Sequence, residues 1–193
     1  MMLDKDTLGV ISVSVSMVGY GSYLWSIYKN RTKPHIFSWG IWGILMALVF
    51  FAQMSKGAGA GAWVTGASAL MCFIITLSSL KKGEKSITRS DWIAFSGALA
   101  AIPIWYLTQD PLSVVILATV IDALAYYPTF RKSFIRPHEE YYLTYVLDIS
   151  KWIVALFALQ DYSATSTLYP LFLLLANSCL VGMILWRRHH LKS

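Results

Sequence analysis

Three ionisable residues, Asp122, Asp148 and Lys151, stand inside long apolar stretches of the sequence. Asp122 lies nine residues before Arg131 and Asp148 nine residues after Glu139, so in helices both would sit about 13–14 Å from a charged flank. Lys151 follows Asp148 by three residues and shares its helical face. A charge at that depth in a bilayer costs at least ~2.5–3.5 kcal/mol. The three groups are therefore expected to face the inside of a helix bundle and to neutralise one another.

Two interpretations of this charged cluster follow from its chemistry. An Asp–Lys pair can be purely structural and fix how neighbouring helices pack. Alternatively, the cluster can bind a polar solute or carry protons. Ionisable residues inside a membrane are functional by default, so the second interpretation is favoured. Proton coupling through Asp122 or Asp148 stays open.

Polar residues near these charges extend the candidate site along helical faces. Asn177 lies ten residues before Arg187 and therefore at a similar depth. The predicted solute-binding residues are Thr119, Asp122, Tyr126, Tyr145, Asp148, Lys151, Trp152 and Asn177. The spacing places the first three on one face of one helix and the next four on one face of another.

The apolar segments that contain these residues have the composition and length of membrane-spanning helices. The chain has 193 residues, of which 56% are hydrophobic and 13% charged, against about 25% charged in soluble domains. Seven apolar segments cover residues 8–28, 36–54, 60–80, 92–108, 112–130, 141–159 and 165–186. Each has about the 17–25 residues that a helix needs to cross a bilayer. The sequence predicts a single all-α membrane domain with seven transmembrane helices and the lipid bilayer as its main partner.

The net charge of +6 is explained by membrane topology, so no nucleic-acid partner is expected. Thirteen of the 16 Lys and Arg fall on one side of an alternating seven-helix thread: Lys29, Arg31, Lys33, Lys81, Lys82, Lys85, Arg89, Arg131, Lys132, Arg136, Arg187, Arg188 and Lys192. The positive-inside rule makes that side cytoplasmic. We therefore expect an external amino terminus and a cytoplasmic carboxyl terminus in a plasma membrane.

The chain also looks internally duplicated. A shift of 103 residues pairs Tyr23 with Tyr126 and the Pro34–His35 loop with its counterpart at 137–138. The predicted units are residues 8–82 and 112–188, joined by a linker helix at 91–108. An odd linker helix gives both three-helix units the same orientation, which makes them parallel repeats. Gly19 stands where the second unit has Asp122, so one asymmetric site is expected rather than two equal ones.

This three-plus-one-plus-three pattern resembles the SWEET and PQ-loop superfamily, which includes PnuC-type vitamin transporters. The segment Tyr127-Pro-Thr-Phe-Arg-Lys132 is similar to the Pro-Gln signature of that superfamily, with Thr129 in place of Gln. Asn177 matches the pocket asparagine of the last helix in SWEETs. The segment Thr32-Lys-Pro-His-Ile-Phe-Ser-Trp39 is similar to a signature of bacterial membrane proteins of this size. The resemblance implies a solute transporter, and this last segment implies a bacterial inner membrane.

We expect a transporter that moves a small polar or zwitterionic solute by alternating access. The alternative is a membrane receptor or sensor with the same fold, including a form in which Lys151 holds a chromophore as a Schiff base. An enzyme acting on lipids ranks lowest, because no catalytic motif is present. No cofactor, metal site or disulfide is expected, since the two cysteines lie within spans and no metal-ligand spacing occurs. The solute, the coupling ion and a homo-oligomeric state stay open.

Overall fold

The structure is a computed structural model of the whole chain and describes residues 4–31, 34–83, 89–108, 110–135, 137–139 and 142–190. These residues fold into α-helices and short 3-10 helices, with no strand among them. The elements are α1 (Lys5–Tyr28), α2 (Ile36–Ser55), η1 (Gly59–Ala62), α3 (Trp63–Lys82), α4 (Arg89–Thr108), α5 (Pro111–Ile135), η2 (Pro137–Glu139), α6 (Tyr142–Ala158) and α7 (Ala164–His190). The all-α fold class is confirmed, and each predicted apolar segment coincides with a helix.

Several of these helices suit a bilayer. Four are long and apolar enough to cross it: α1, α2, the continuous run of η1 and α3, and α7. Large apolar side chains cover the outside of the bundle, and Val18, Leu70, Leu77, Leu107 and Leu124 are each more than half exposed. An exposed apolar surface of this extent suits contact with lipid rather than water. The apolar helices therefore fit a multi-pass membrane protein.

Polar side chains mark where the helices begin. Asp4 precedes α1 and accepts a hydrogen bond from the backbone N–H of Thr7 at 2.7 Å, which holds the pKa of its carboxyl below the ordinary value. Asp110 precedes α5, and its carboxylate accepts from the hydroxyl and the backbone N–H of Ser113. These bonds lower the pKa of Asp110 in the same way. Both carboxylates satisfy N–H groups that have no partner within their helix.

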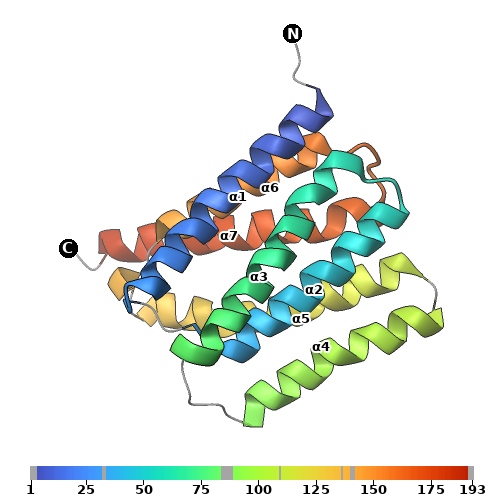
Figure 1. Cartoon of the computed structure of the whole chain (residues 1–193). Helices are drawn as coiled ribbons and strands as arrows, with labels where there is room; N and C mark the ends of the chain where they lie inside the picture. Colours follow the sequence, from blue (N-terminus) through green and yellow to red (C-terminus); the bar gives the residue numbers. More distant parts are fainter. Residues whose placement is uncertain are drawn as a thin grey trace.

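The helices pack in two groups of three that follow one pattern (Figure 1). In the first group α3 packs against both α1 and α2, and in the second group α7 packs against both α5 and α6. Between the groups, α1 lies against α6 and α2 lies against α5. Helix α4 packs on α2 and α5 at the edge of the bundle. The space enclosed by α1, α2, α5 and α6 is therefore the natural place for a central site.

Basic residues tie helix ends together at one end of the bundle. Lys82 at the end of α3 donates to the carbonyl of Tyr28 at the end of α1, at 2.9 Å. Arg187 near the end of α7 donates to the carbonyl of Phe134 near the end of α5, also at 2.9 Å. Each group of three thus has its third helix fastened to its first by a basic side chain. We call this the basic end of the bundle.

Candidate functional site

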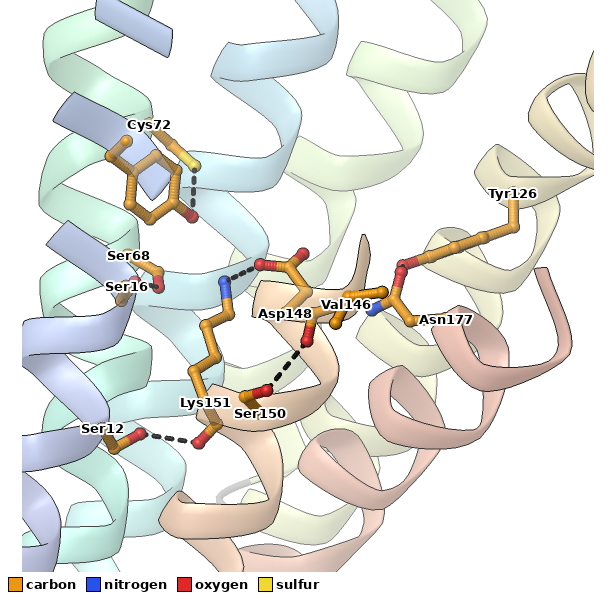
Figure 2. A network of polar contacts seen from close by, with 11 residues as sticks. Ser12, Ser16, Ser68, Cys72, Tyr126, Val146, Asp148, Ser150, Lys151 and Asn177 are labelled. Atoms are coloured by element: carbon orange, nitrogen blue, oxygen red, sulfur yellow. Dashed lines mark hydrogen bonds and ion pairs between the residues drawn. The ribbon is translucent and has the colours of Figure 1, made fainter. Parts of the chain in front are cut away.

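The predicted ion pair is present on α6. The Nζ atom of Lys151 lies 2.7 Å from the Oδ1 atom of Asp148 (Figure 2). The Lys151 side chain is 4% exposed and that of Asp148 is 34% exposed. The same ammonium group lies 5.2 Å from the ring centroids of both Tyr20 and Trp152. One carboxylate and two aromatic faces therefore hold the lysine, which compensates for its removal from water.

A backbone contact fixes where this pair sits relative to the first group. The hydroxyl of Ser12 on α1 donates to the carbonyl oxygen of Lys151 at 2.7 Å (Figure 2). One turn further along α1, Ser16 pairs with Ser68 of α3 at 3.3 Å. Two small hydroxyls thus join α1 to α6 and to α3 in the middle of the bundle.

Asp122 has a different environment from the one predicted. Its Oδ1 atom accepts from the indole N–H of Trp42 at 3.2 Å, and its Oδ2 atom accepts from the hydroxyl of Tyr169 at 2.9 Å. In this conformation Lys151 pairs with Asp148 and not with Asp122, so contact between Asp122 and Lys151 in another conformation stays a prediction. Two neutral donors stabilise Asp122 instead.

These groups border a cavity of about 530 Å³. Helices α1, α2, α3, α5, α6 and α7 all contribute to its wall. At mid-depth the wall includes Ser16, Met46, Asp122 and Lys151. From there it extends to the basic end, where its lining includes His35, just before α2, and Thr144, near the start of α6. The cavity is therefore elongated and approaches one end of the bundle.

Aromatic rings make up much of the wall. The ring centroids of Tyr23 and Trp39 are 4.8 Å apart, and those of Trp39 and Trp42 are 5.2 Å apart with perpendicular planes. The indole N–H of Trp39 donates to the hydroxyl of Tyr23 at 3.3 Å. The ring of Trp39 lines the cavity. Together with Tyr20, these three residues form an aromatic cluster beside Asp122, and we call it the aromatic wall.

The structure brings most of the predicted site residues together. Asp122, Tyr126, Tyr145, Asp148, Lys151 and Trp152 all line the cavity. Asn177 does not, but it accepts a hydrogen bond from the hydroxyl of Tyr126 at 3.0 Å, and its buried Nδ2 atom has no partner. Thr119 donates to the carbonyl of Val115 on its own helix at 2.7 Å and also lies outside the cavity lining. Asn177 therefore acts on the cavity through Tyr126, whereas the hydroxyl of Thr119 bonds to a backbone carbonyl of its own helix.

Sequence reasoning missed the two donors to Asp122. Trp42 follows Trp39 by three residues, so the two indoles had to share a helical face; that spacing was the available signal. Tyr169 is completely buried on α7 and only the fold brings it to Asp122. The Pro-Gln-like motif falls on Tyr127, Pro128, Thr129, Arg131 and Lys132, whose side chains lie outside the described residues, as do residues 32 and 33 of the signature at 32–39.

The opposite end of the bundle is closed by close backbone packing. A Cβ atom on Gly61 would lie 2.7 Å from the backbone N and Cα atoms of Leu159, and one on Gly9 would lie 2.8 Å from the Cβ of Ala60. The backbone N–H of Gln160 donates to the carbonyl of Ala58 at 2.9 Å. Glycine is required where backbones approach this closely. The contact of η1 and the residues beside it with Gly9 and with Leu159–Gln160 is called the seal.

Two glutamines reach across this seal from equivalent places. Gln53 near the end of α2 donates from Nε2 to the carbonyl of Ser166, near the start of α7, at 2.9 Å. Gln160, which follows α6, packs its side chain on Gly59 at the start of η1. Gly59 has φ +62°, a backbone conformation that side chains disfavour. Each group of three thus sends one glutamine onto the segment that begins the third helix of the other group.

No protein-family model, no curated protein and no solved structure matches this chain.

Proposed function

We propose that the chain is a SWEET-like membrane transporter that moves a small polar or zwitterionic solute by alternating access. The observation that carries this proposal is a cavity that extends from the charged cluster to one end of the bundle, while the other end is closed by the seal. Such an arrangement is what one half of an alternating-access cycle requires. In this state the solute site would be reached from the basic end.

Two parallel repeats are the second part of the proposal. The matching order of helices within each group, the reciprocal contacts α1–α6 and α2–α5, and the paired glutamines all support it. So do the basic tethers from α3 to Tyr28 and from α7 to Phe134. In this account residues 8–82 and 112–188 are the repeats, and 91–108 is the linker helix. Rocking of one repeat against the other would close the cavity at the basic end and open the seal.

The third part of the proposal is that all seven helices span the membrane and that the basic end lies in the cytoplasm. Helix α6 carries Asp148 and Lys151 toward the cavity, so its charge does not prevent it from crossing the bilayer as part of the bundle. A reporter that is active only in the cytoplasm, fused after Ser193, is expected to be active. A reporter that needs the periplasm, fused at the same place, should be silent. The reverse pattern would contradict the proposed orientation.

Alternating access can be tested without knowing the solute. Gly19 lines the cavity, and a Cβ atom there meets nothing within 4 Å. In a background with Cys72→Ala and Cys179→Ala, the Gly19→Cys variant should react with a charged, membrane-impermeant thiol reagent applied to either face of oriented vesicles. Reaction from the basic side reports the conformation described here. Reaction from the other side requires a conformation in which the seal is open.

Gly21→Cys is the matched control for this measurement. A Cβ at Gly21 also meets nothing within 4 Å, but Gly21 is exposed on the outer surface and does not line the cavity. A cysteine facing lipid is kept from water and forms little reactive thiolate, so it should stay unlabelled from both faces. Labelling of Gly19→Cys from the basic side alone would favour the receptor alternative. In that case the carboxylate 2.7 Å from Lys151 would suit a Schiff-base counter-ion, and visible absorbance would test for a chromophore.

A further inference from the structure

The charges that line the cavity do not balance. Lys151 and Asp148 form an ion pair and offset each other. Asp122 has only the neutral donors Trp42 and Tyr169. Apart from the imidazole of His35, the described residues that line the cavity therefore carry one net negative charge when Asp122 is ionised.

The carboxylate of Asp122 has room for another partner. Each of its oxygens accepts one hydrogen bond, whereas a carboxylate has about four acceptor sites. The same residue lines the cavity although only 2% of its surface is exposed. A carboxylate so shielded from water gains more from a nearby positive charge than it would at a surface.

The aromatic wall has the complementary chemistry. Trp39 and Trp42 stand perpendicular to each other, and Tyr23 lies against Trp39. Aromatic faces attract cations through their quadrupole, and boxes of such rings recognise quaternary ammonium groups. The ammonium of Lys151 already uses this chemistry at Tyr20 and Trp152. The remaining faces, next to Asp122, suit a second cation, which the described lining of the cavity does not supply.

We infer that the solute of this cavity is a small organic cation, held between the aromatic wall and the carboxylate of Asp122. The inference rests on the proposed solute site and narrows its substrate class. A zwitterion fits less well, because Lys151, the one ammonium group among the described lining residues, is held by Asp148. An anion would face the net negative charge.

Binding to purified protein in detergent tests the substrate class. Choline and tetramethylammonium are the cationic probes, and 3,3-dimethylbutan-1-ol is the neutral isostere of choline. Titration calorimetry should show both cations binding and the neutral alcohol binding at least about tenfold more weakly, since a desolvated cation–π contact and a paired charge each exceed that difference. Equal affinity for choline and the alcohol, or no binding of either cation, would overturn the inference.

Two variants test which residues bind the cation. Asp122→Asn keeps the shape of the side chain and should weaken choline binding at least about tenfold, whereas Asp110→Asn removes an exposed carboxylate outside the cavity and should leave it unchanged. Trp39→Leu serves if Asp122→Asn does not fold: it should weaken choline binding and spare that of the neutral alcohol. Unchanged choline affinity in a folded Asp122→Asn, or equal losses for both probes in Trp39→Leu, would overturn the assignment.

The outcome separates this inference from the proposed function. Choline binding in detergent without choline exchange across the membrane of proteoliposomes would support the cation site and contradict the proposed transport function. Labelling of Gly19→Cys from both faces, without binding of either cation, would support the transporter and contradict the inference that its solute is an organic cation.

Discussion

Replacing Asp148 by leucine alone is expected to lower the free energy of unfolding by about 3–5 kcal/mol. The change leaves the Lys151 ammonium, which is 4% exposed, without its counter-charge. The reverse change, Lys151→Met, should cost less, because the carboxylate left behind is 34% exposed and retains contact with cavity water. Unfolding in detergent, monitored by near-ultraviolet circular dichroism, measures the free energy of unfolding of each variant. Lys56→Met, at an exposed lysine, is the control and should stay within about 0.5 kcal/mol of the parent.

Combining Asp148→Leu with Lys151→Met should recover most of the lost stability, because a buried ion pair is often replaced by apolar groups of similar volume at little cost. A double variant as unstable as Asp148→Leu alone would show that the pair itself is not the source of the effect. The double variant also separates two roles. A pair that only fixes packing leaves the two-sided labelling of Gly19→Cys and ligand binding intact, whereas a pair that belongs to the solute site yields a folded protein that has lost both.

Placing a methyl group in the seal should shift the protein toward its other conformation. In Gly61→Ala the new Cβ would lie 2.7 Å from backbone atoms of Leu159, so the two segments must separate. Overpacking of this kind costs about 1–3 kcal/mol, and the cost falls only on the state in which the seal is closed. Labelling of Gly19→Cys from the face opposite the basic end should rise, by about tenfold for each 1.4 kcal/mol.

Gly21→Ala is the matched control, because its Cβ meets nothing within 4 Å. It should leave the labelling ratio unchanged and stabilise α1 slightly, as alanine does in helices. If Gly61→Ala leaves the ratio unchanged in a folded protein, the seal is a fixed part of the scaffold and rocking of the repeats loses its main support.

The helices could be predicted from sequence because apolar length is a strong local signal. The segment at 36–54 became α2 at Ile36–Ser55, and the segment at 112–130 became the first part of α5. Helix α5 continues to Ile135, since nothing in its basic continuation breaks a helix once it leaves the apolar region. Local pattern also placed Lys151 beside Asp148, because three residues on a helix bring two side chains together.

The environment of Asp122 could not be predicted in the same way. Its partners lie on α2 and α7, far from it in the chain, and no local rule says which helices will meet. Depth alone suggested a contact with Lys151, but residues at equal depth can point to different walls of a cavity. The partners at the closed end could not be predicted for a similar reason: the close approach of Gly59 and Gly61 to Gln160 and Leu159 depends on the packing of two distant segments.

All three ionisable groups at mid-depth belong to α5 and α6, and the equivalent position on α1 is Gly19. In the proposed arrangement of two repeats, the membrane potential would therefore act on the charges of one repeat and not on the other. In the proposed cycle a bound cation cancels the charge of Asp122, so the loaded protein would reorient without sensing the voltage. The empty protein would carry one negative charge through part of the field, worth up to about 2.3 kcal/mol per 100 mV. A potential that is negative inside would then speed the return of the empty site to the outside, and charge movement recorded without any solute would report that step.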